Sequence, residues 1–453
     1  MTMKKMKHDV PIRLVKVLIL ILMMVAFGFV WYGYYAARAQ VHYYRRGDWV
    51  VILLFGILYY GFCRSYDAFH ISISPISEII YSQTLALIIS DFIMYVVIWL
   101  LSLYMPNAVP LLITFGVQFL ISVLWTFLAH QWYFHNFRPG RTAVIYDLRE
   151  GMESLVGEYG MEKKFHIEKV LGVEECLEKL SVLDEMDTVF LSGIHSHERN
   201  IILKYCMYQD IQVYVIPRIG DVIMGGAKKV HMFHLPMLRI DRYRPIPEYT
   251  IAKRAFDILF SGIAIVIASP FMLVTAIAIK SDGGPALYKQ KRLTKDGKEF
   301  NVLKFRSMRV DAEKDGVARL STGDKDDRIT PVGKIIRKIR FDELPQLFNI
   351  LRGDMSIVGP RPERPEIARQ YEEEMPEFRL RLQAKAGLTG YAQVYGKYNT
   401  TPYDKLLMDL TYIGTPSLWE DFKICLATVK ILFMPESTEG VAEGATTAMN
   451  GKK

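Results

Sequence analysis

Four long apolar runs near the start of the chain restrict its fold more than any other feature. They cover residues 15–35, 49–62, 83–103 and 109–128, and aromatic flanks extend the second. A helix of about 20 apolar residues crosses the hydrocarbon core of a bilayer. Aromatic residues gather at the ends of these runs, as at headgroup depth: Trp31, Tyr32, Trp49, Trp132 and Tyr133. Residues 1–135 are therefore predicted to form four transmembrane helices.

The charges around these runs predict their orientation. Lysine and arginine are concentrated before the first run, which places the N-terminus in the cytoplasm, and that run is too long for a cleaved signal peptide. Four spans return the chain to the cytoplasm, where Arg138 and Arg141 fit. Inside the third run, Asp91 is either a functional intramembrane acid or, as we expect, a residue with a structural partner on a neighbouring helix.

The overall charge narrows the class of partner. The net charge is +8, and 51% of the 453 residues are hydrophobic. A basic chain can bind nucleic acid, anionic lipid or a phosphorylated substrate. The apolar runs favour lipid and phosphate, so we expect no nucleic-acid partner. The four cysteines are scattered without a paired spacing, which indicates neither a disulfide framework nor a zinc site.

Residues 141–240 have a different pattern. Short β-rich runs at 143–146, 165–171, 188–192 and 213–217 alternate with polar helical stretches. This alternation predicts a small parallel α/β domain. A dinucleotide-binding domain carries a G-x-G-x-x-G turn after its first strand. Here that turn reads YDLREGMES, with one glycine, so we expect a degenerate structural or regulatory domain.

A fifth apolar run covers residues 258–279, with Ser269 and Pro270 near its middle. Proline removes one intrahelical hydrogen bond and kinks a helix. Mixed polar and amphipathic sequence follows, and we assign residues 251–433 to a third domain. The tail, residues 434–453, is small and polar and is predicted to be disordered.

Chemistry is concentrated at two adjacent carboxylates, Asp342 and Glu343. Splitting a pyrophosphate requires a nucleophile, cations for the spreading charge and commonly Mg²⁺. A carboxylate can be that nucleophile. Neighbours on a helix point about 100° apart, so the pair can divide the labour: one attacks, while the other holds a metal or takes a proton. An isolated Asp-Glu pair is more often a first helical turn that the helix dipole favours.

The surrounding motifs decide between these interpretations. The segment RITPVGKIIRKIRFDELPQLFNILRGDMSIVGPRPE (residues 328–363) resembles the catalytic core of the bacterial sugar transferase family, the polyprenyl-phosphate phosphoglycosyl transferases. Three more segments match in order: KQKRLTKDGKEFNVLKFRSM (289–308), AGLTGYAQV (386–394) and SLWEDFKICLATVKILF (417–433). The resemblance runs from about residue 253 to 433. Thr294, Ala386 and Tyr391 stand where the family often has other residues, which affects loop shape more than chemistry.

The resemblance implies a reaction and its residues. Asp342 would attack the sugar-bearing phosphate of a UDP-sugar, expel UMP and hold the sugar phosphate covalently. Glu343 would then help undecaprenyl phosphate attack and would lie at the Mg²⁺. The implied phosphate or nucleotide contacts are basic residues: Lys304, Arg306, Arg337 and Arg361. This reaction begins capsule, exopolysaccharide or O-antigen assembly.

The resemblance also implies an architecture. It predicts a membrane α/β protein with four N-terminal spans, a Rossmann-like domain and a membrane-associated α/β catalytic domain. Ser269 and Pro270 would kink a re-entrant helix, which keeps the catalytic domain on the cytoplasmic side of a bacterial inner membrane. The length of the fifth run by itself favours an ordinary fifth span.

Other functions remain open at this point. The chain could be a non-catalytic scaffold or regulator of polysaccharide assembly, a glycosyl transferase that releases UDP, or a sugar-nucleotide dehydratase or epimerase housed in residues 141–240. The intact Asp342–Glu343 pair argues against the first, and the missing glycines argue against the last. The sequence leaves a homo-oligomer open.

Overall fold

The computed structural model describes residues 3–39, 47–149, 151–281, 283–310, 328–396 and 400–432, with side chains from residue 10 onward. The predicted tail, 434–453, lies outside the described residues. The chain divides into two compact units, residues 1–216 and 217–453. Residues 217–240, which the sequence pattern groups with the α/β domain, belong to the second of these units.

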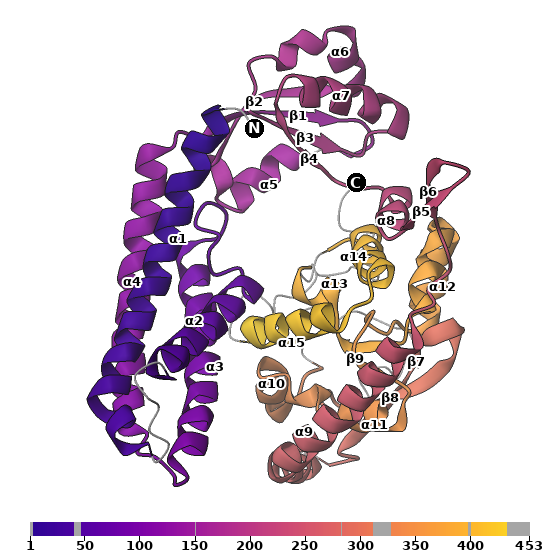
Figure 1. Ribbon diagram of the computed structural model, residues 1–453. Helices are drawn as coiled ribbons and strands as arrows, with labels where there is room; N and C mark the ends of the chain where they lie inside the picture. Colours follow the sequence, from indigo (N-terminus) through magenta and orange to yellow (C-terminus); the bar gives the residue numbers. More distant parts are fainter. Residues whose placement is uncertain are drawn as a thin grey trace. The chain divides into compact units, whose positions relative to one another are not determined.

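The first unit begins with long apolar helices that lie side by side (Figure 1). They are α1 (Met3–Val30), α2 (Gly47–Ser65), α3 (Ile76–Ser102) and α4 (Val109–Asn136), and short π and 3₁₀ turns continue α1 to Arg38. Aromatic rings fill the space between α1 and α2, where Phe27 stacks on Phe55 at 4.6 Å. The outer faces are apolar too, and Phe29 is 77% exposed. A helix that is apolar all round is typical of a membrane span.

Asp91 does not have the hydrogen-bonding partner that we expected. It lies in α3 and is buried, yet neither of its carboxylate oxygens accepts a hydrogen bond from a described residue. The polar contact that does join α3 to α4 is the hydrogen bond from Ser122 to Gln83, two turns away. The prediction of a structural hydrogen-bond partner is therefore wrong for the described part of the chain.

A parallel four-stranded sheet forms the rest of the first unit, as the βαβ pattern predicts. Its strands are β1 (Gly140–Tyr146), β2 (Phe165–Gly172), β3 (Thr188–Ser192) and β4 (Gln212–Val215), in the order β2-β1-β3-β4. The connecting helices are α5 (Met152–Glu158), α6 (Val173–Glu178) and α7 (Ser196–Tyr208). Residues of β3 are buried throughout, which is typical of a strand covered on both faces.

The strand order reverses between β1 and β3, which is where open α/β sheets bind ligands. In this chain the two loops at that edge lie close together. Gly193, at φ 70°, approaches the loop after β1 so closely that a Cβ there would lie 2.8 Å from the Arg149 nitrogen. The loops after β1 and β3 are therefore in close contact at this edge of the sheet.

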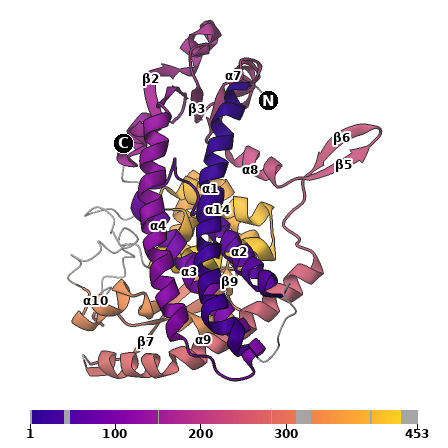
Figure 2. The same ribbon diagram turned by 60° about the vertical axis from the view of Figure 1, so that its left-hand side comes forward.

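The second unit contains short sheets surrounded by helices. Its strand pairs are β5 (Lys228–Met232) with β6 (Leu235–Arg239), β7 (Leu287–Leu293) with β8 (Glu299–Phe305), and β9 (Ser356–Val358) with β10 (Gly387–Thr389). The helices other than α9 are α8 (Ile219–Gly225), α10 (Pro331–Lys338), α11 (Gln346–Arg352), α12 (Pro365–Glu374), α13 (Tyr391–Val394), α14 (Pro402–Gly414) and α15 (Leu418–Leu432). The β5–β6 hairpin projects away from the rest of this unit (Figure 2).

Helix α9 (Pro247–Ser281) is one continuous helix of 35 residues along an edge of the second unit (Figure 2). It begins at Pro247, ahead of the apolar run at 258–279, and Tyr249 near its start is buried and donates to Asp421 of α15. Helix α9 is one of five helices in the described chain that are long and apolar enough to cross a membrane. Pro270 cannot donate to the Val266 carbonyl, and the Ser269 hydroxyl donates to that oxygen instead at 2.8 Å.

Both halves of α9 pack against the second unit. In the first half, Arg254 donates to the Ile350 and Leu351 carbonyls at the end of α11, at 2.6 and 2.7 Å. Asp257 accepts from the Ile357 amide at 2.9 Å. In the second half, Ile279 joins the cluster around Phe305 and Ile336. The opposite face is exposed and apolar, with Val266 73% and Val274 66% exposed.

Candidate active site

The two predicted catalytic carboxylates lie on a short 3₁₀ helix, Phe341–Glu343, between α10 and α11. Arg340 precedes them in the left-handed region at φ 55°, which ends α10 and turns the chain sharply. Phe341 then packs against Phe271 of α9, with ring centroids 6.4 Å apart. This contact anchors the carboxylate-bearing turn to the apolar helix and leaves both acids beside basic residues.

Two cations hold Glu343. Lys304 of β8 donates from Nζ to Glu343 Oε1 at 2.8 Å, and Arg361 donates to the same oxygen at 3.2 Å. Glu343 is mostly buried, with 15% of its side chain exposed. Asp342 accepts no hydrogen bond from the residues that the structure describes. One carboxylate is thus fixed by two cations, while the other has its oxygens available for another partner.

The electrostatics separate the two acids further. Burial, and then the neighbouring charge of Glu343, raise the pKa of Asp342 above its ordinary value. Burial acts in the same direction on Glu343, but Lys304 and Arg361 outweigh it and hold the pKa of Glu343 well below its usual range. Glu343 is therefore a permanent anion at neutral pH. Asp342 is the more basic of the two acids, as suits a nucleophile.

Arg337 lies near Asp342 at the end of α10. Its positive charge lowers the pKa of Asp342, and its Nε donates to the Ser307 hydroxyl at 2.9 Å. Helix α10 reaches this place by a close contact, because a Cβ on Gly333 would lie 2.0 Å from the Ser307 carbonyl oxygen. The structure therefore brings Arg337 together with Asp342, Glu343, Lys304 and Arg361.

Arg306 is placed differently from the other predicted residues. It is 7% exposed, and among the described residues its guanidinium donates to the backbone carbonyls of Ile279, Gly283, Pro285 and Met308. These bonds tie the end of α9 to β8. A phosphate contact would require some of them to break. Sequence similarity alone could not distinguish Arg306 from Lys304, two residues earlier, because both are basic residues of the same motif and both suggest a phosphate contact.

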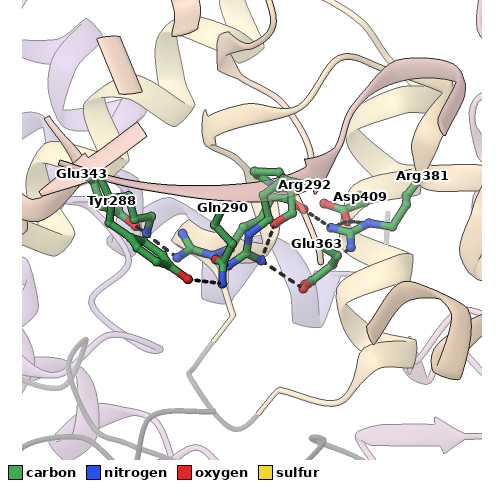
Figure 3. A network of polar contacts seen from close by, with 10 residues as sticks. Tyr288, Gln290, Arg292, Glu343, Glu363, Arg381 and Asp409 are labelled. Carbon is green, nitrogen blue, oxygen red and sulfur yellow. Dashed lines mark hydrogen bonds and ion pairs between the residues drawn. The ribbon is translucent and has the colours of Figure 1, made fainter. Parts of the chain in front are cut away.

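Figure 3 shows a second group of charged residues, to which sequence reasoning gave no role; it contacts the loop that carries Arg361. Arg292 of β7, Glu363, Arg381 and Asp409 form linked ion pairs, and Arg381 reaches the backbone of Arg361. Arg292 and Glu363 lie inside the segments 289–308 and 328–363 that resemble the family, but the resemblance assigned them no role, and Arg381 and Asp409 lie outside the matched segments. Their positions are spread over more than a hundred residues of the chain, and only the fold brings them together.

The donor set fits Mg²⁺ in one particular way. In the described chain no cluster of three or more metal-ligating side chains occurs. Mg²⁺ is commonly held by one or two carboxylates together with substrate phosphates, however. Asp342 and the second oxygen of Glu343 accept no hydrogen bond from described residues, so they could serve as such carboxylates. A complete site would require the phosphates of a bound substrate.

Known proteins resemble part of this chain. Residues 248–435 match the bacterial sugar transferase family. The chain is 39% identical to the UDP-N-acetylgalactosamine-undecaprenyl-phosphate N-acetylgalactosaminephosphotransferase of Aeromonas hydrophila over 234 residues, 51% of this chain and 54% of that protein. It is 41% identical to the UDP-glucose:undecaprenyl-phosphate glucose-1-phosphate transferase of Caulobacter vibrioides over 201 residues, 43% of this chain and 74% of that protein.

A third relative is the UDP-glucose:undecaprenyl-phosphate glucose-1-phosphate transferase of Escherichia coli, which is 38% identical over 212 residues, 46% of this chain and 44% of that protein. The match therefore spans only about half of the Aeromonas and Escherichia proteins, whereas it spans most of the Caulobacter protein. From this match and the family match over residues 248–435, the chain belongs to the bacterial sugar transferase family.

Proposed function

We propose that this protein transfers a sugar-1-phosphate from a UDP-sugar to undecaprenyl phosphate and releases UMP. The observation that carries this proposal is the unequal pair of acids: Asp342 has a raised pKa and no described hydrogen bond, and Glu343 is held by two cations. The names of the relatives, which pair UDP-sugars with undecaprenyl phosphate, support the choice of substrates.

In the first half-reaction the Asp342 carboxylate attacks the sugar-bearing phosphorus. The bond from that phosphorus to the bridging oxygen breaks, and UMP leaves with the electron pair. The transition state spreads negative charge over the phosphoryl oxygens. Lys304, Arg337 and Arg361 lie around the carboxylates and can neutralise this charge. The product is an aspartyl-phosphosugar on Asp342.

In the second half-reaction a phosphate oxygen of undecaprenyl phosphate attacks the same phosphorus. The acyl-phosphate bond breaks, and Asp342 returns to its carboxylate form. Glu343 assists the incoming lipid phosphate and, with the substrate phosphates, would hold Mg²⁺. That ion would supply charge neutralisation on the transferred group. Because its pKa is held low, Glu343 is an anion in both half-reactions.

We propose that α9 enters and leaves the membrane on one face, with Ser269 and Pro270 at the turn. Two observations support this proposal. Arg254 in the first half and Ile279 in the second both contact the catalytic unit, so a full crossing would carry part of that unit with it. The missing backbone bond at Pro270 is replaced by the Ser269 hydroxyl. The exposed apolar face of α9 would then lie in one leaflet.

This topology places the catalytic unit where UDP-sugars are available. We therefore propose a multi-pass protein of the bacterial inner membrane, with residues 1–135 as four spans, 141–216 as a degenerate Rossmann-like domain and 251–433 as a cytoplasmic catalytic domain, against whose unit residues 217–240 pack. Its product would begin capsule, exopolysaccharide or O-antigen assembly. The names of the relatives support the transferase role, and the five long apolar helices of the described chain support a membrane setting.

The leaving nucleotide tests this function. Membranes containing the full chain, supplied with undecaprenyl phosphate and a panel of UDP-sugars, are expected to release UMP with at least one sugar. The Asp342→Asn variant, expressed at the same level, is expected to release none. Release of UDP would indicate a glycosyl transferase instead. No nucleotide release with any sugar would favour a non-catalytic role in polysaccharide assembly.

A further inference from the structure

The loop that carries Arg361 is held along its whole backbone. The Gly359 amide donates to the Thr389 carbonyl, and the Pro360 carbonyl accepts from the Gly387 amide, at 2.8 and 2.9 Å. A Cβ on Gly359 would lie 2.3 Å from the Lys385 carbonyl oxygen, so only glycine fits there. These contacts connect the start of the loop to β10. Because its backbone is held in this way, the loop directs the Arg361 side chain toward Glu343.

The three carbonyls that follow each accept one hydrogen bond from a different donor. Arg381 donates to the Arg361 carbonyl at 2.8 Å. Arg292 donates to the Pro362 carbonyl at 3.1 Å, and the Leu293 amide donates to the Glu363 carbonyl at 3.0 Å. The middle of the loop is therefore fixed by side chains, not by a sheet. Of these bonds, the one from Arg381 reaches the residue whose side chain contacts Glu343.

Arg381 is itself held by a buried acid. Its Nε donates to Asp409 Oδ2 at 2.8 Å, and a second guanidinium nitrogen lies 2.7 Å from the same oxygen. The Arg381 side chain is 4% exposed and the Asp409 side chain 1%. The pair connects the 3₁₀ segment Pro376–Gln383 with α14. A guanidinium fixed in this way has little freedom to release the Arg361 carbonyl.

We propose that Arg381 and Asp409 are positioning residues, which set the loop carrying Arg361 so that its guanidinium stays on Glu343. The inference rests on the proposed phosphoryl transfer. Neither residue has a described contact with Asp342, Glu343 or Lys304, so their effect passes through the loop, at the Arg361 carbonyl and at the Glu363 carboxylate, which lies 3.6 Å from Arg381. Displacing a group by about 1 Å in an active site can cost about 100-fold in rate.

The energetics of buried ion pairs allow a positioning role to be distinguished from a stabilising role by experiment. Buried ion pairs contribute little to stability on balance, because desolvation of both charges offsets their attraction. Replacing both partners by apolar residues of similar size is often neutral for folding. Arg381 and Asp409 can therefore be removed together, which isolates their effect on the loop from their effect on the fold.

The test compares the full chain with the double variant Arg381→Met/Asp409→Leu in detergent. We expect an unchanged unfolding midpoint, a fall of about 100-fold in kcat for UMP release and a change in KM of less than about threefold. Arg361→Met should cause the same fall, and the triple variant no further one, because both changes act through the Arg361–Glu343 contact. Should the double variant fail to fold, Asp409→Asn keeps the shape of the pair and should lower kcat less.

The matched control is Lys291→Gln/Glu299→Gln, which removes an exposed ion pair of the same unit and should leave kcat unchanged. A double variant with wild-type kcat, or losses that multiply in the triple variant, overturns the proposal. Hydrogen exchange gives a readout independent of the reaction. The amides of Gly359, Arg361 and Glu363, the residues of this segment that have an amide hydrogen, should exchange at least about tenfold faster in the double variant. Unchanged exchange overturns the positioning role even if the wild-type chain releases no UMP.

Discussion

The ion pair between Lys304 and Glu343 allows the strongest quantitative prediction. Lys304→Met removes one of the two cations on Glu343 Oε1 and keeps the length of the side chain. Arg361 then remains as the other described partner of that oxygen, at 3.2 Å. The negative charge of Glu343 would then be balanced by one fewer cation, and the transferred phosphoryl group would also lose a nearby cation.

The size of the effect follows from the geometry. Two unit charges 2.8 Å apart attract by about 6 kcal/mol at an effective dielectric constant of about 20, and by about 1.5 kcal/mol in water. The side chains are 22% and 15% exposed, so the pair lies between these limits. Hydrogen bonds to charged groups contribute about 1.5–3 kcal/mol. A loss of about 2–3 kcal/mol from the transition state lowers the rate by about 30- to 150-fold.

The pH dependence provides a second readout for the same variant. Lys304 lowers the pKa of Asp342, so its removal raises that pKa further. Asp342 must be ionised to attack. Activity lost as the pH falls should therefore be lost at a higher pH in Lys304→Met than in the wild-type chain. A substitution that acted only on the fold would lower the rate without moving this acid limb.

The assay is UMP release under saturating UDP-sugar and lipid acceptor, from about pH 5 to pH 8. Lys304→Arg keeps the charge and should lose much less. Lys291→Met, on the neighbouring strand β7, removes an exposed lysine and serves as the matched control. The reasoning is refuted if Lys304→Met retains more than about one third of the wild-type rate, or if its acid limb does not move.

Three further predictions concern the dyad, the topology and the α/β domain. Glu343→Gln removes a charge that raises the pKa of Asp342, so the pH at which the first UMP burst is lost on acidification should fall, and transfer to the lipid should be severely impaired. An unchanged pH for this loss contradicts an electrostatic effect of Glu343 on Asp342. Cysteines at Glu248 and Lys280, at the two ends of α9, should both resist an impermeant reagent applied to intact cells, and labelling of one of them only would establish a full span. The full chain in detergent should show no micromolar affinity for NAD, since the loops after β1 and β3 approach closely at Gly193, and such binding by calorimetry would refute this.

The parts that the sequence predicts well depend on repeated local patterns. The apolar runs lie in α1–α4 and α9, because a helix without a polar face has few alternatives to lipid. The four strands of the parallel sheet lie within two or three residues of the predicted runs, since buried strands read as short apolar segments. The start of α9 was missed because Tyr249 is buried through Asp421, a contact across more than 170 residues.

The site residues also divide into those that the sequence indicates and those that it does not. Asp342, Glu343, Lys304, Arg337 and Arg361 could be named from neighbouring motifs, and the structure brings them together. Arg381 and Asp409 could not, because a charged residue in a polar helix gives no sign that its partner lies 28 residues away in a buried pair. Arg306 is the opposite case. Its motif suggests a phosphate contact, whereas its guanidinium donates to backbone carbonyls.

The central claim is that Asp342 carries the sugar phosphate between the two half-reactions. The most direct measurement is intact-protein and peptide mass spectrometry of the full chain, incubated with its UDP-sugar in the absence of undecaprenyl phosphate. We predict a mass increase equal to one sugar phosphate, on the peptide that contains Asp342, and its disappearance when lipid acceptor is added. Asp342→Asn should give no adduct. An adduct on Glu343, or steady turnover to lipid without any adduct on Asp342, would contradict the account.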